Sequence, residues 1–130
     1  MIEFIATNDE LRASGHYSQA VVHNGLVYVS GQLPFDFKSG EPVHGSAKEQ
    51  ARAVLTNLNR VLQAADSRLE LVLRCTLYLS DIQLWDEVNE VYSEFFGEHK
   101  PARTVVPTTP LHFGFKIEAD AIAVVDDRNQ

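Results

Sequence analysis

The sequence predicts an α+β fold in which two helices cover one face of a single, mixed β-sheet. Strand-like patterns occur near the start, in the middle and at the end of the chain, and two segments between them have apolar residues at helical spacing. Each helical segment has one apolar stripe, which suits two helices on the same sheet face. With 130 residues, the chain has a common size for one domain, which we expect to span residues 1–130.

Composition and charge narrow the class of protein. Hydrophobic residues make up 45% of the chain and charged residues 22%, as is usual for globular proteins. The formal net charge of -7 argues against a surface that neutralises phosphates, so nucleic acid is not an expected partner.

Cysteine usage and the lack of long apolar runs indicate where the protein works. The single cysteine, Cys75, cannot form an intrachain disulfide, which indicates a reducing compartment. No apolar run approaches the roughly 18 residues of a membrane span, and the amino terminus lacks the pattern of a signal peptide. We therefore expect a cytoplasmic protein that does not bind membranes.

A β-hairpin is predicted close to the amino terminus. The chain opens with a short apolar run, residues 2–5, and a polar stretch up to Ala13, and residues 14–20 have the composition of a loop. Two β-rich runs, residues 21–23 and 26–29, are then separated by Asn24-Gly25. This dipeptide favours a type I′ turn, because both central residues of that turn need a positive φ.

The first helix is predicted to begin after Ser46. Residues 33–45 contain two prolines and two glycines and read as an irregular connection. Ser46 and Glu49 have the spacing of a capping box, in which the side chains satisfy the first free backbone donors. Apolar residues then recur at helical spacing, so one helix face must be buried: Ala51, Val54, Leu55, Leu58, Val61, Leu62 and Ala65.

A central strand and a second helix follow. Residues 69–79 alternate, and we expect one face of this strand to carry Leu71, Leu73, Cys75, Leu77 and Leu79. Cys75 would then be an inert thiol in the core rather than a nucleophile. Asp81 is expected to cap the second helix and Gly97 to end it. Its apolar stripe is assigned to the core: Leu84, Trp85, Val88, Val91, Tyr92, Phe95 and Phe96.

The closing strands hold the residues that look placed for chemistry. Arg103 opens a short β-branched run, and a proline-rich reversal leads to residues 115–125, which alternate and place Lys116, Glu118 and Asp120 on one face. An arginine and a carboxylate close together on a polar sheet face would bind an acidic substrate and handle a water molecule. The alternative is an ordinary surface arginine and a solvated strand face.

That polar face also carries apolar residues. Ile122 and Val124 lie on it with Glu118, and this mixture suits a subunit interface better than open water.

Other chemistries lack support in the sequence. The five histidines show no helical i,i+4 pair and no cysteine partner, so no metal site is expected. There is no glycine-rich nucleotide motif, no nucleophile elbow and no lysine in an apolar setting that would lower its pKa. We expect no cofactor.

Several short motifs together resemble those of the RidA/YjgF family of reactive-intermediate (imine) deaminases. They stand in the expected order over residues 15–125: Gly15-His16-Tyr17-Ser18-Gln19-Ala20, Ser30-Gly31-Gln32-Leu33-Pro34, Val88-Asn89-Glu90-Val91-Tyr92, Pro101-Ala102-Arg103 and Ile117-Glu118-Ala119-Asp120-Ala121-Ile122-Ala123. The resemblance implies a chorismate-mutase-like fold, a homotrimer with sites between subunits, and hydrolysis of reactive imines or enamines, a repair of metabolite damage.

The resemblance also assigns roles to individual residues. Arg103 resembles the arginine that grips the substrate carboxylate, and Glu118 resembles the acid that positions the attacking water. The pocket lining would include Tyr17, Ser30, Gly31 and Asn89, with Gly31 offering a backbone donor.

The chain departs from the family pattern at several places. His16 stands where proline is familiar, Val105 where some members carry cysteine, the connection from Phe96 to Pro101 is short, and residues 107–113 form an unusual turn. These departures bear on substrate identity rather than on the core chemistry.

The expected function is the cofactor-free hydrolysis of 2-imino or enamine acids, such as 2-iminopropanoate, to 2-oxo acids and ammonia. The alternatives are a pathway-specific deaminase, such as one acting on 2-aminomuconate, and a non-catalytic regulatory module that binds a small carboxylate. The ribonuclease label attached to some relatives ranks last, because the chain is acidic and shows no basic groove.

Overall fold

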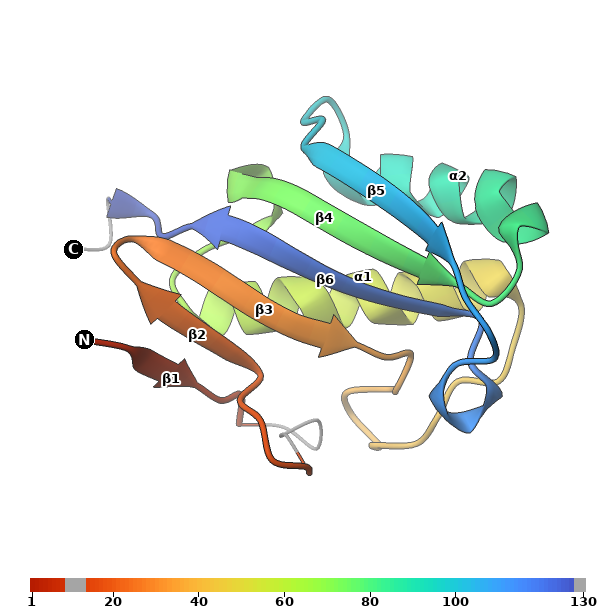
Figure 1. The fold of residues 1–130 in the computed structure, drawn as a ribbon, viewed down its shortest axis with the longest axis horizontal. Helices are drawn as coiled ribbons and strands as arrows, with labels where there is room; N and C mark the ends of the chain where they lie inside the picture. The colour runs from red at the N-terminus through yellow and green to blue at the C-terminus, as the bar shows by residue number, and fades with distance from the viewer. Residues whose placement is uncertain (9–13, 128–130) are drawn as a thin grey trace.

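The computed structural model describes residues 1–8 and 14–127, and Figure 1 shows their arrangement. Six strands form one sheet in the order β1-β2-β3-β6-β4-β5. Neighbouring strands are antiparallel except β4 and β5, which are parallel, so the sheet is mixed as predicted. The strands are β1 (Glu3–Ile5), β2 (Ala20–His23), β3 (Leu26–Gln32), β4 (Val72–Leu79), β5 (Ala102–Pro107) and β6 (Ile117–Val124).

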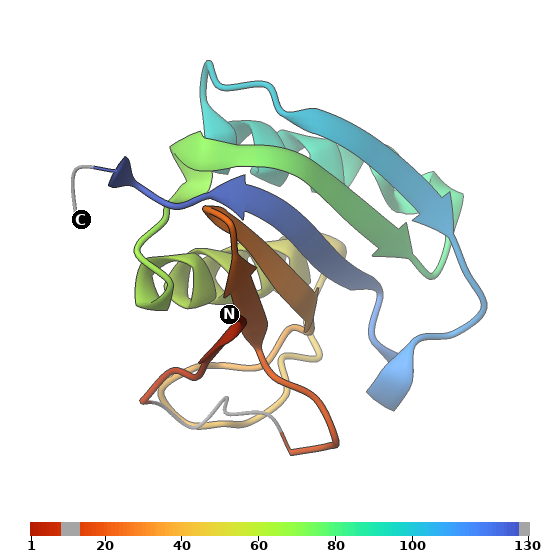
Figure 2. The same cartoon turned by 60° about the vertical axis from the view of Figure 1, so that its left-hand side comes forward.

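Two helices, α1 (Ala47–Ala64) and α2 (Trp85–Phe96), lie on the same side of the sheet, as Figure 2 shows from a second direction. Short 3₁₀ turns, η1 (Leu69–Leu71), η2 (Ile82–Leu84) and η3 (His112–Gly114), connect the larger elements. The predicted α+β arrangement with both helices on one face is confirmed. We call the opposite side of the sheet the open face, because no described element covers it.

The structure confirms the predicted turn after β2, the cap of α1 and the end of α2. Asn24 and Gly25 have φ values of 51° and 79°, as a type I′ turn requires. The backbone N–H of Glu49 donates to the Ser46 side chain at 3.2 Å, which confirms the cap of α1. Gly97 ends α2 with a φ of 60°.

The second helix begins differently from the prediction. The Asp81 side chain accepts a hydrogen bond from the backbone of Gln83 at 2.8 Å, so it caps η2. The α-helix proper starts only at Trp85, after this 3₁₀ turn.

The core lies between the sheet and the helices. On β6, Ile117, Ala119, Ala121 and Ala123 are buried as predicted. The register between β4 and β6 shifts between Val72 and Arg74, and such a bulge reverses the alternation. Val72 is therefore 1% exposed and Leu73 49% exposed, so the assignment of Leu73 to the buried face was wrong. Leu71 lies in η1, before the strand begins.

Two buried amides of α1 fix backbone segments at the ends of β3 and β6. Asn57 Nδ2 donates to the carbonyl oxygens of Leu33 and Phe35, each at 2.9 Å. Gln50 Oε1 accepts from the backbone N–H of Lys116 at 2.8 Å. Because buried polar groups are costly when unpaired, these bonds hold the segments that follow Gly31 and precede Glu118.

Two sequence expectations remain, the polar stretch after Ile5 and the lack of a membrane span. Most of the polar stretch expected after Ile5, residues 9–13, lies outside the described residues. Over the described part of the chain, neither helix has the length and apolarity needed to cross a membrane.

Candidate active site

Arg103 lies on the edge strand β5 and points toward α2. Its Cα is paired with that of Cys75 in β4, whose side chain is buried beneath the helices. Paired residues of neighbouring strands share a face. Arg103 Nη1 donates to Asn89 Oδ1 at 2.9 Å, so the structure brings these two predicted site residues together.

Two aromatic rings of α2 flank the guanidinium of Arg103. Its central carbon lies 4.7 Å from the centre of the Tyr92 ring and 5.4 Å from that of Trp85, distances typical of cation–π contacts. Arg103 and Asn89 help to line a hollow of about 400 Å³ at the carboxyl end of α2. Since a guanidinium has five N–H donors and only one serves Asn89, the others can bind a carboxylate in this hollow.

Trp85 and Tyr92 are the site residues that sequence reasoning missed. Both were assigned to the core stripe, and for Trp85 this was wrong, because its side chain is 38% exposed and lies against Arg103. The signal was present in the sequence, since positions 85, 89 and 92 share one face of a helix. The Asn89 motif, extended by this spacing, identifies both aromatic residues.

Cys75 lies beneath this part of the site. Burial raises the pKa of its thiol to about 12, and Tyr92 and Arg103 lower the pKa by less. The Tyr92 hydroxyl approaches the thiol but has no hydrogen bond of regular geometry to any described residue. The thiol therefore stays protonated, in agreement with the predicted structural role.

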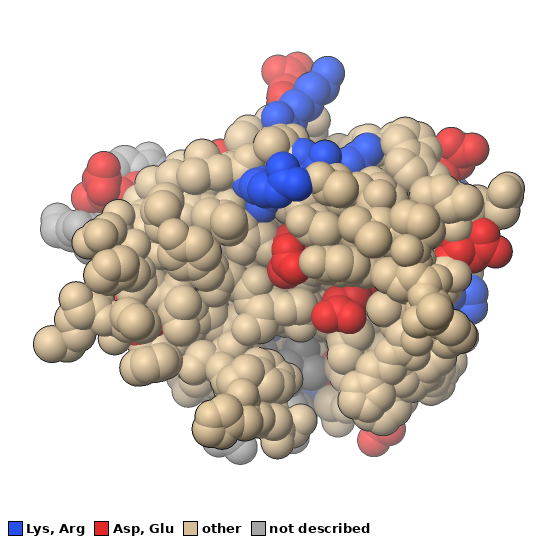
Figure 3. Space-filling view, viewed as in Figure 1, with Lys and Arg blue, Asp and Glu red and all other residues tan. Residues whose placement is uncertain are grey.

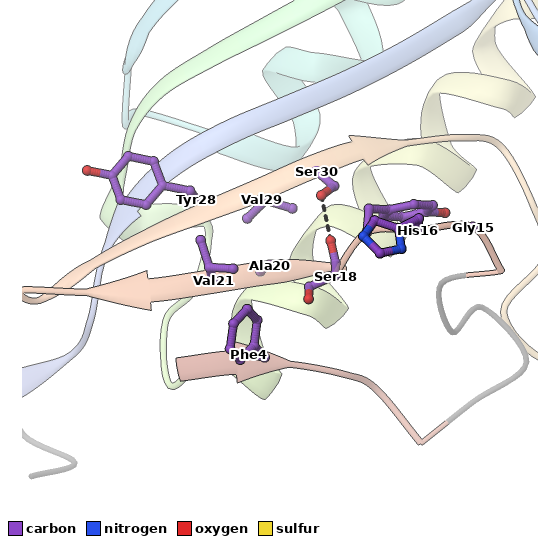
Figure 4. Close-up of a pocket in the computed structure, with 10 residues that line it drawn as sticks. Phe4, Gly15, His16, Ser18, Ala20, Val21, Tyr28, Val29 and Ser30 are labelled. Carbon is purple, nitrogen blue, oxygen red and sulfur yellow. Dashed lines mark hydrogen bonds between the residues drawn. The ribbon is translucent and has the colours of Figure 1, made fainter. Parts of the chain in front are cut away.

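A second hollow, of about 670 Å³, is lined by Tyr17 and Ser30. Figure 4 shows this hollow and labels Ser30. Its walls include Phe4, Val21 and Tyr28 from the open face of β1, β2 and β3. The Ser30 hydroxyl donates to the carbonyl oxygen of Ser18 at 2.6 Å, and the Ser30 N–H donates to that of Gln19 at 2.9 Å. These bonds fix the loop that carries Tyr17.

His16 also lines this second hollow. The departure from the family pattern at this position therefore changes a pocket wall.

Glu118 stands on the open face of β6, next to Gly31. A Cβ on Gly31 would lie 2.0 Å from Glu118 Oε2, so the carboxylate occupies the space that a side chain there would fill. Burial and then the neighbouring Asp120 raise the pKa of Glu118 above its usual range, and His112 lowers the pKa by less. A carboxyl group with a raised pKa is a stronger proton acceptor, as general-base chemistry requires.

The predicted site residues thus form two groups on opposite faces of the sheet. Arg103 of β5 pairs with Cys75, and Glu118 of β6 pairs with Tyr78. Cys75 and Tyr78 both lie on β4, the strand between β5 and β6. Positions 75 and 78 differ by an odd number, so they face opposite sides. The expectation that arginine and glutamate lie close together on one polar sheet face was wrong, and within one protomer the two groups do not meet.

The open face has the composition of an interface. Phe4 and Tyr28 are 71% and 43% exposed on it, and Ile122 and Val124 are partly exposed. Figure 3 looks onto this face and shows acidic groups near the middle, basic groups above them, and uncharged side chains over much of the remaining surface. Large exposed patches of this kind mark association sites in proteins.

Metal ligation finds no support within residues 1–8 and 14–127. These ranges contain no group of three or more His, Cys, Asp or Glu side chains that could hold a metal ion.

Comparison with known proteins places this geometry in a family. The profile described as Endoribonuclease L-PSP matches residues 7–125. The RutC family protein of Pyrococcus horikoshii is 42% identical over 123 residues, covering 95% of this chain and 98% of that protein. The 2-iminobutanoate/2-iminopropanoate deaminase of Rattus norvegicus is 40% identical over 120 residues, covering 92% of this chain and 88% of the relative.

A solved structure agrees with these sequence matches. The crystal structure of E. coli TdcF with bound serine superposes with a TM-score of 0.89 and 32% identity, and the match covers 95% of this chain and 99% of TdcF. The predicted resemblance is confirmed: the chain belongs to the Endoribonuclease L-PSP family, which comprises the RutC, YjgF and RidA proteins.

Proposed function

We propose that the protein is a hydrolytic deaminase that converts reactive 2-imino or enamine acids, such as 2-iminopropanoate, to 2-oxo acids and ammonia. One observation carries this proposal: Asn89 holds Arg103 in a hollow with guanidinium donors left to bind a carboxylate, and Glu118, partly buried and with a raised pKa, stands on the opposite face beside Gly31. Relatives about 40% identical are named deaminases of this kind, which supports the proposal.

The two groups of residues would meet between subunits. The open face, with its exposed Phe4 and Tyr28, would be covered by neighbouring copies in a cyclic homotrimer. Arg103 of one subunit would then face Tyr17, Ser30, Gly31 and Glu118 of the next. Light scattering that finds a stable monomer at micromolar concentration would contradict this arrangement.

The chemistry needs no group beyond these side chains. Arg103 holds the substrate carboxylate through parallel N–H bonds and so places the imine carbon. Glu118 accepts a proton from water as the water oxygen bonds to that carbon and the C=N electron pair moves to nitrogen. Return of that proton to nitrogen gives a carbinolamine. Glu118 then moves the hydroxyl proton of the carbinolamine to its nitrogen, so the C=O bond forms as the C–N bond breaks, which yields the 2-oxo acid and ammonia. The Gly31 backbone offers a hydrogen-bond donor nearby.

A second candidate is a non-catalytic module that binds a small carboxylate in the same place. TdcF was crystallised with serine, which carries a carboxylate, and Arg103 alone would suffice for binding. The two candidates differ in whether Glu118 is needed. We do not propose a ribonuclease, because a net charge of -7 opposes binding to phosphates.

Ammonia release from freshly generated imino acids tests the proposal. We expect Glu118→Gln to lower kcat by about 10²-fold or more while a 2-oxo acid still binds. Arg103→Ala should lose both turnover and binding of the 2-oxo acid. Arg103→Lys should weaken both turnover and binding, because lysine lacks the bidentate fork of a guanidinium. Arg52→Ala, which removes a guanidinium from the exposed surface of α1, is the matched control.

Parental turnover in Glu118→Gln, together with lost ligand binding in Arg103→Ala, would contradict catalysis and favour the binding module. A panel of imino acids that includes larger dicarboxylic members, such as 2-aminomuconate, would separate a general deaminase from a pathway-specific one.

A further inference from the structure

Glu118 has a second carboxylate beside it on the open face of β6. Asp120 follows two residues later and therefore shares this face. Tyr78 of β4 is the direct cross-strand partner of Glu118, and its hydroxyl donates to Asp120 Oδ2 at 2.9 Å. The backbone of Tyr78 thus lies opposite Glu118, and its side chain reaches diagonally across to the carboxylate of Asp120.

The Tyr78 hydroxyl remains a donor over the working pH range. Burial, and then the hydrogen bond to Asp120, raise the pKa of Tyr78 above its usual value. The phenol is consequently protonated and holds the Asp120 carboxylate in one orientation.

The titratable groups nearest to Glu118 come from three elements. Asp120 acts from the same strand, Tyr78 contributes a neutral phenol from β4, and His112 acts from η3. On β3, Glu118 meets Gly31, which has no charge. Two further basic residues stand an even number of positions from Tyr78 or Glu118 and so are assigned to the open face. They are Arg74, which donates to the hydroxyl of Thr104, and Lys116, two residues before Glu118.

No described residue forms a hydrogen bond or ion pair with the Glu118 carboxylate. After burial, Asp120 is the largest influence on its proton affinity, ahead of His112. Two carboxylates that share a site without a bridging cation resist ionising together, and this makes one of them hold a proton more tightly. The raised pKa of Glu118 is therefore caused in part by Asp120, a residue that need not touch the substrate.

We propose that Asp120, oriented by the Tyr78 hydroxyl, is a positioning residue that strengthens Glu118 as a proton acceptor. This inference rests on the proposed deaminase function, in which Glu118 takes the proton of the attacking water. Asp120→Asn removes the charge and keeps the shape of the side chain, so Glu118 would ionise more readily and bind the transferred proton less strongly.

The expected results concern both the pH profile and the rate. In Asp120→Asn, the acid limb of the kcat/KM profile should move to lower pH, and the plateau kcat should fall by about two- to tenfold. Asp120→Glu keeps the charge and should retain a limb close to the parental one. Tyr78→Phe frees the Asp120 carboxylate to turn. The acid limb of the kcat/KM profile of Tyr78→Phe should therefore lie between those of the parent and of Asp120→Asn.

A direct titration separates this inference from the proposed function. The ¹³C signal of the Glu118 carboxyl, assigned by its loss in Glu118→Gln, should titrate at lower pH in Asp120→Asn than in the parent. Glu3→Gln, which removes a carboxylate on the far strand β1, should leave the titration unchanged. Thermal melting of each variant shows that it is folded.

Each outcome decides one question. An unchanged Glu118 titration in Asp120→Asn would overturn the inference, whatever the activity. A parental titration in Tyr78→Phe would remove Tyr78 from the proposal. A shifted titration in Asp120→Asn, combined with full activity in Glu118→Gln, would retain the electrostatic coupling but reject Glu118 as the base, and so reject the deaminase mechanism.

Discussion

Arg103 and Glu118 point to opposite faces of one sheet, from strands that have β4 between them. Two strand spacings and three residues along the strand separate their Cα atoms by about 14 Å. No side-chain rotation brings the two groups onto one small substrate. If both residues act in one reaction, they come from different subunits.

Mixed oligomers should therefore recover activity that neither parent variant has. If the protein is the proposed homotrimer, Arg103→Ala and Glu118→Gln subunits that are unfolded together in equal amounts and refolded would form mixed cyclic trimers, in which one interface joins an intact arginine to an intact glutamate. Random mixing then predicts about a quarter of the parental rate of ammonia release.

A matched control uses Glu118→Gln subunits mixed with the double variant Arg103→Ala, Glu118→Gln. No arrangement of these chains contains an intact glutamate, so activity should stay at background. Background activity in the first mixture as well, with mixed trimers shown by native mass spectrometry, would contradict a shared site.

Local chemistry explains which parts of the fold were predictable from sequence. The Asn24-Gly25 turn, the Ser46 cap and the alternation of β6 depend on neighbours in the chain, and the structure confirms all three. By contrast, which sheet faces Arg103 of β5 and Glu118 of β6 occupy could not be predicted in this way, because it depends on the insertion of β4 between the two strands. Alternation within one strand cannot say which of its faces meets the core.

The site was predictable in its residue types but not in its assembly. Motif resemblance selected Arg103, Asn89, Tyr17 and Ser30, and the structure places them in two hollows. Trp85 was missed, since an aromatic residue in a helical stripe is most often buried, whereas this one lies at the end of the stripe against Arg103. The bulge before Arg74 also left no sign in the apolar pattern.

Gly31→Ala should impair turnover more than folding. The new methyl group would meet the Glu118 carboxylate, which is the far end of a flexible side chain, so the carboxylate moves and the backbone stays. We expect kcat to fall about tenfold or more, with little change in melting temperature. Gly45→Ala is the matched control, because its Cβ would meet the Glu49 carboxylate at 2.2 Å, outside the proposed site. Equal turnover in both variants would contradict the placement of Glu118.

Trp85 should report ligand binding directly. It is the single tryptophan of the chain and lies against the Arg103 guanidinium, so a 2-oxo acid such as pyruvate should change its fluorescence. Trp85→Ala should weaken ligand binding by about three- to tenfold, the scale of one cation–π contact, and Trp85→Phe by less. Ile82→Ala, an exposed apolar truncation in η2, should leave the affinity unchanged. An unaltered emission spectrum at saturating ligand would place the binding site elsewhere.

Cys75 should resist thiol reagents in the native protein. Its pKa of about 12 and its burial leave almost no accessible thiolate at pH 8. Labelling by iodoacetamide should therefore occur only after unfolding in guanidinium chloride. Cys75→Ser should cost about 1 to 3 kcal/mol of unfolding free energy and spare turnover per folded molecule. Rapid labelling of the native protein would show that the strand opens or that the thiol is exposed.

Glu118→Gln should make the protein more stable at neutral pH while it removes activity. Burial and Asp120 raise the pKa of Glu118 in the folded state, so ionised Glu118 disfavours folding at any pH above that raised value. The penalty disappears as the pH falls below the unfolded value. The melting temperature of Glu118→Gln should therefore exceed that of the parent at pH 7 to 8, and the two should converge near pH 4.

Glu94→Gln provides a control of opposite sign. Its hydrogen bond to Arg52 lowers the pKa of Glu94 in the folded state, so the ionised form favours folding above the unfolded pKa, and that contribution is lost as the pH falls through the folded value. Glu94→Gln should melt at or below the parental temperature at neutral pH. If both glutamine variants changed the melting temperature in the same direction at pH 7, the difference would reflect general surface charge, and Glu118 would not be the carboxylate with a raised pKa that the proposed mechanism requires.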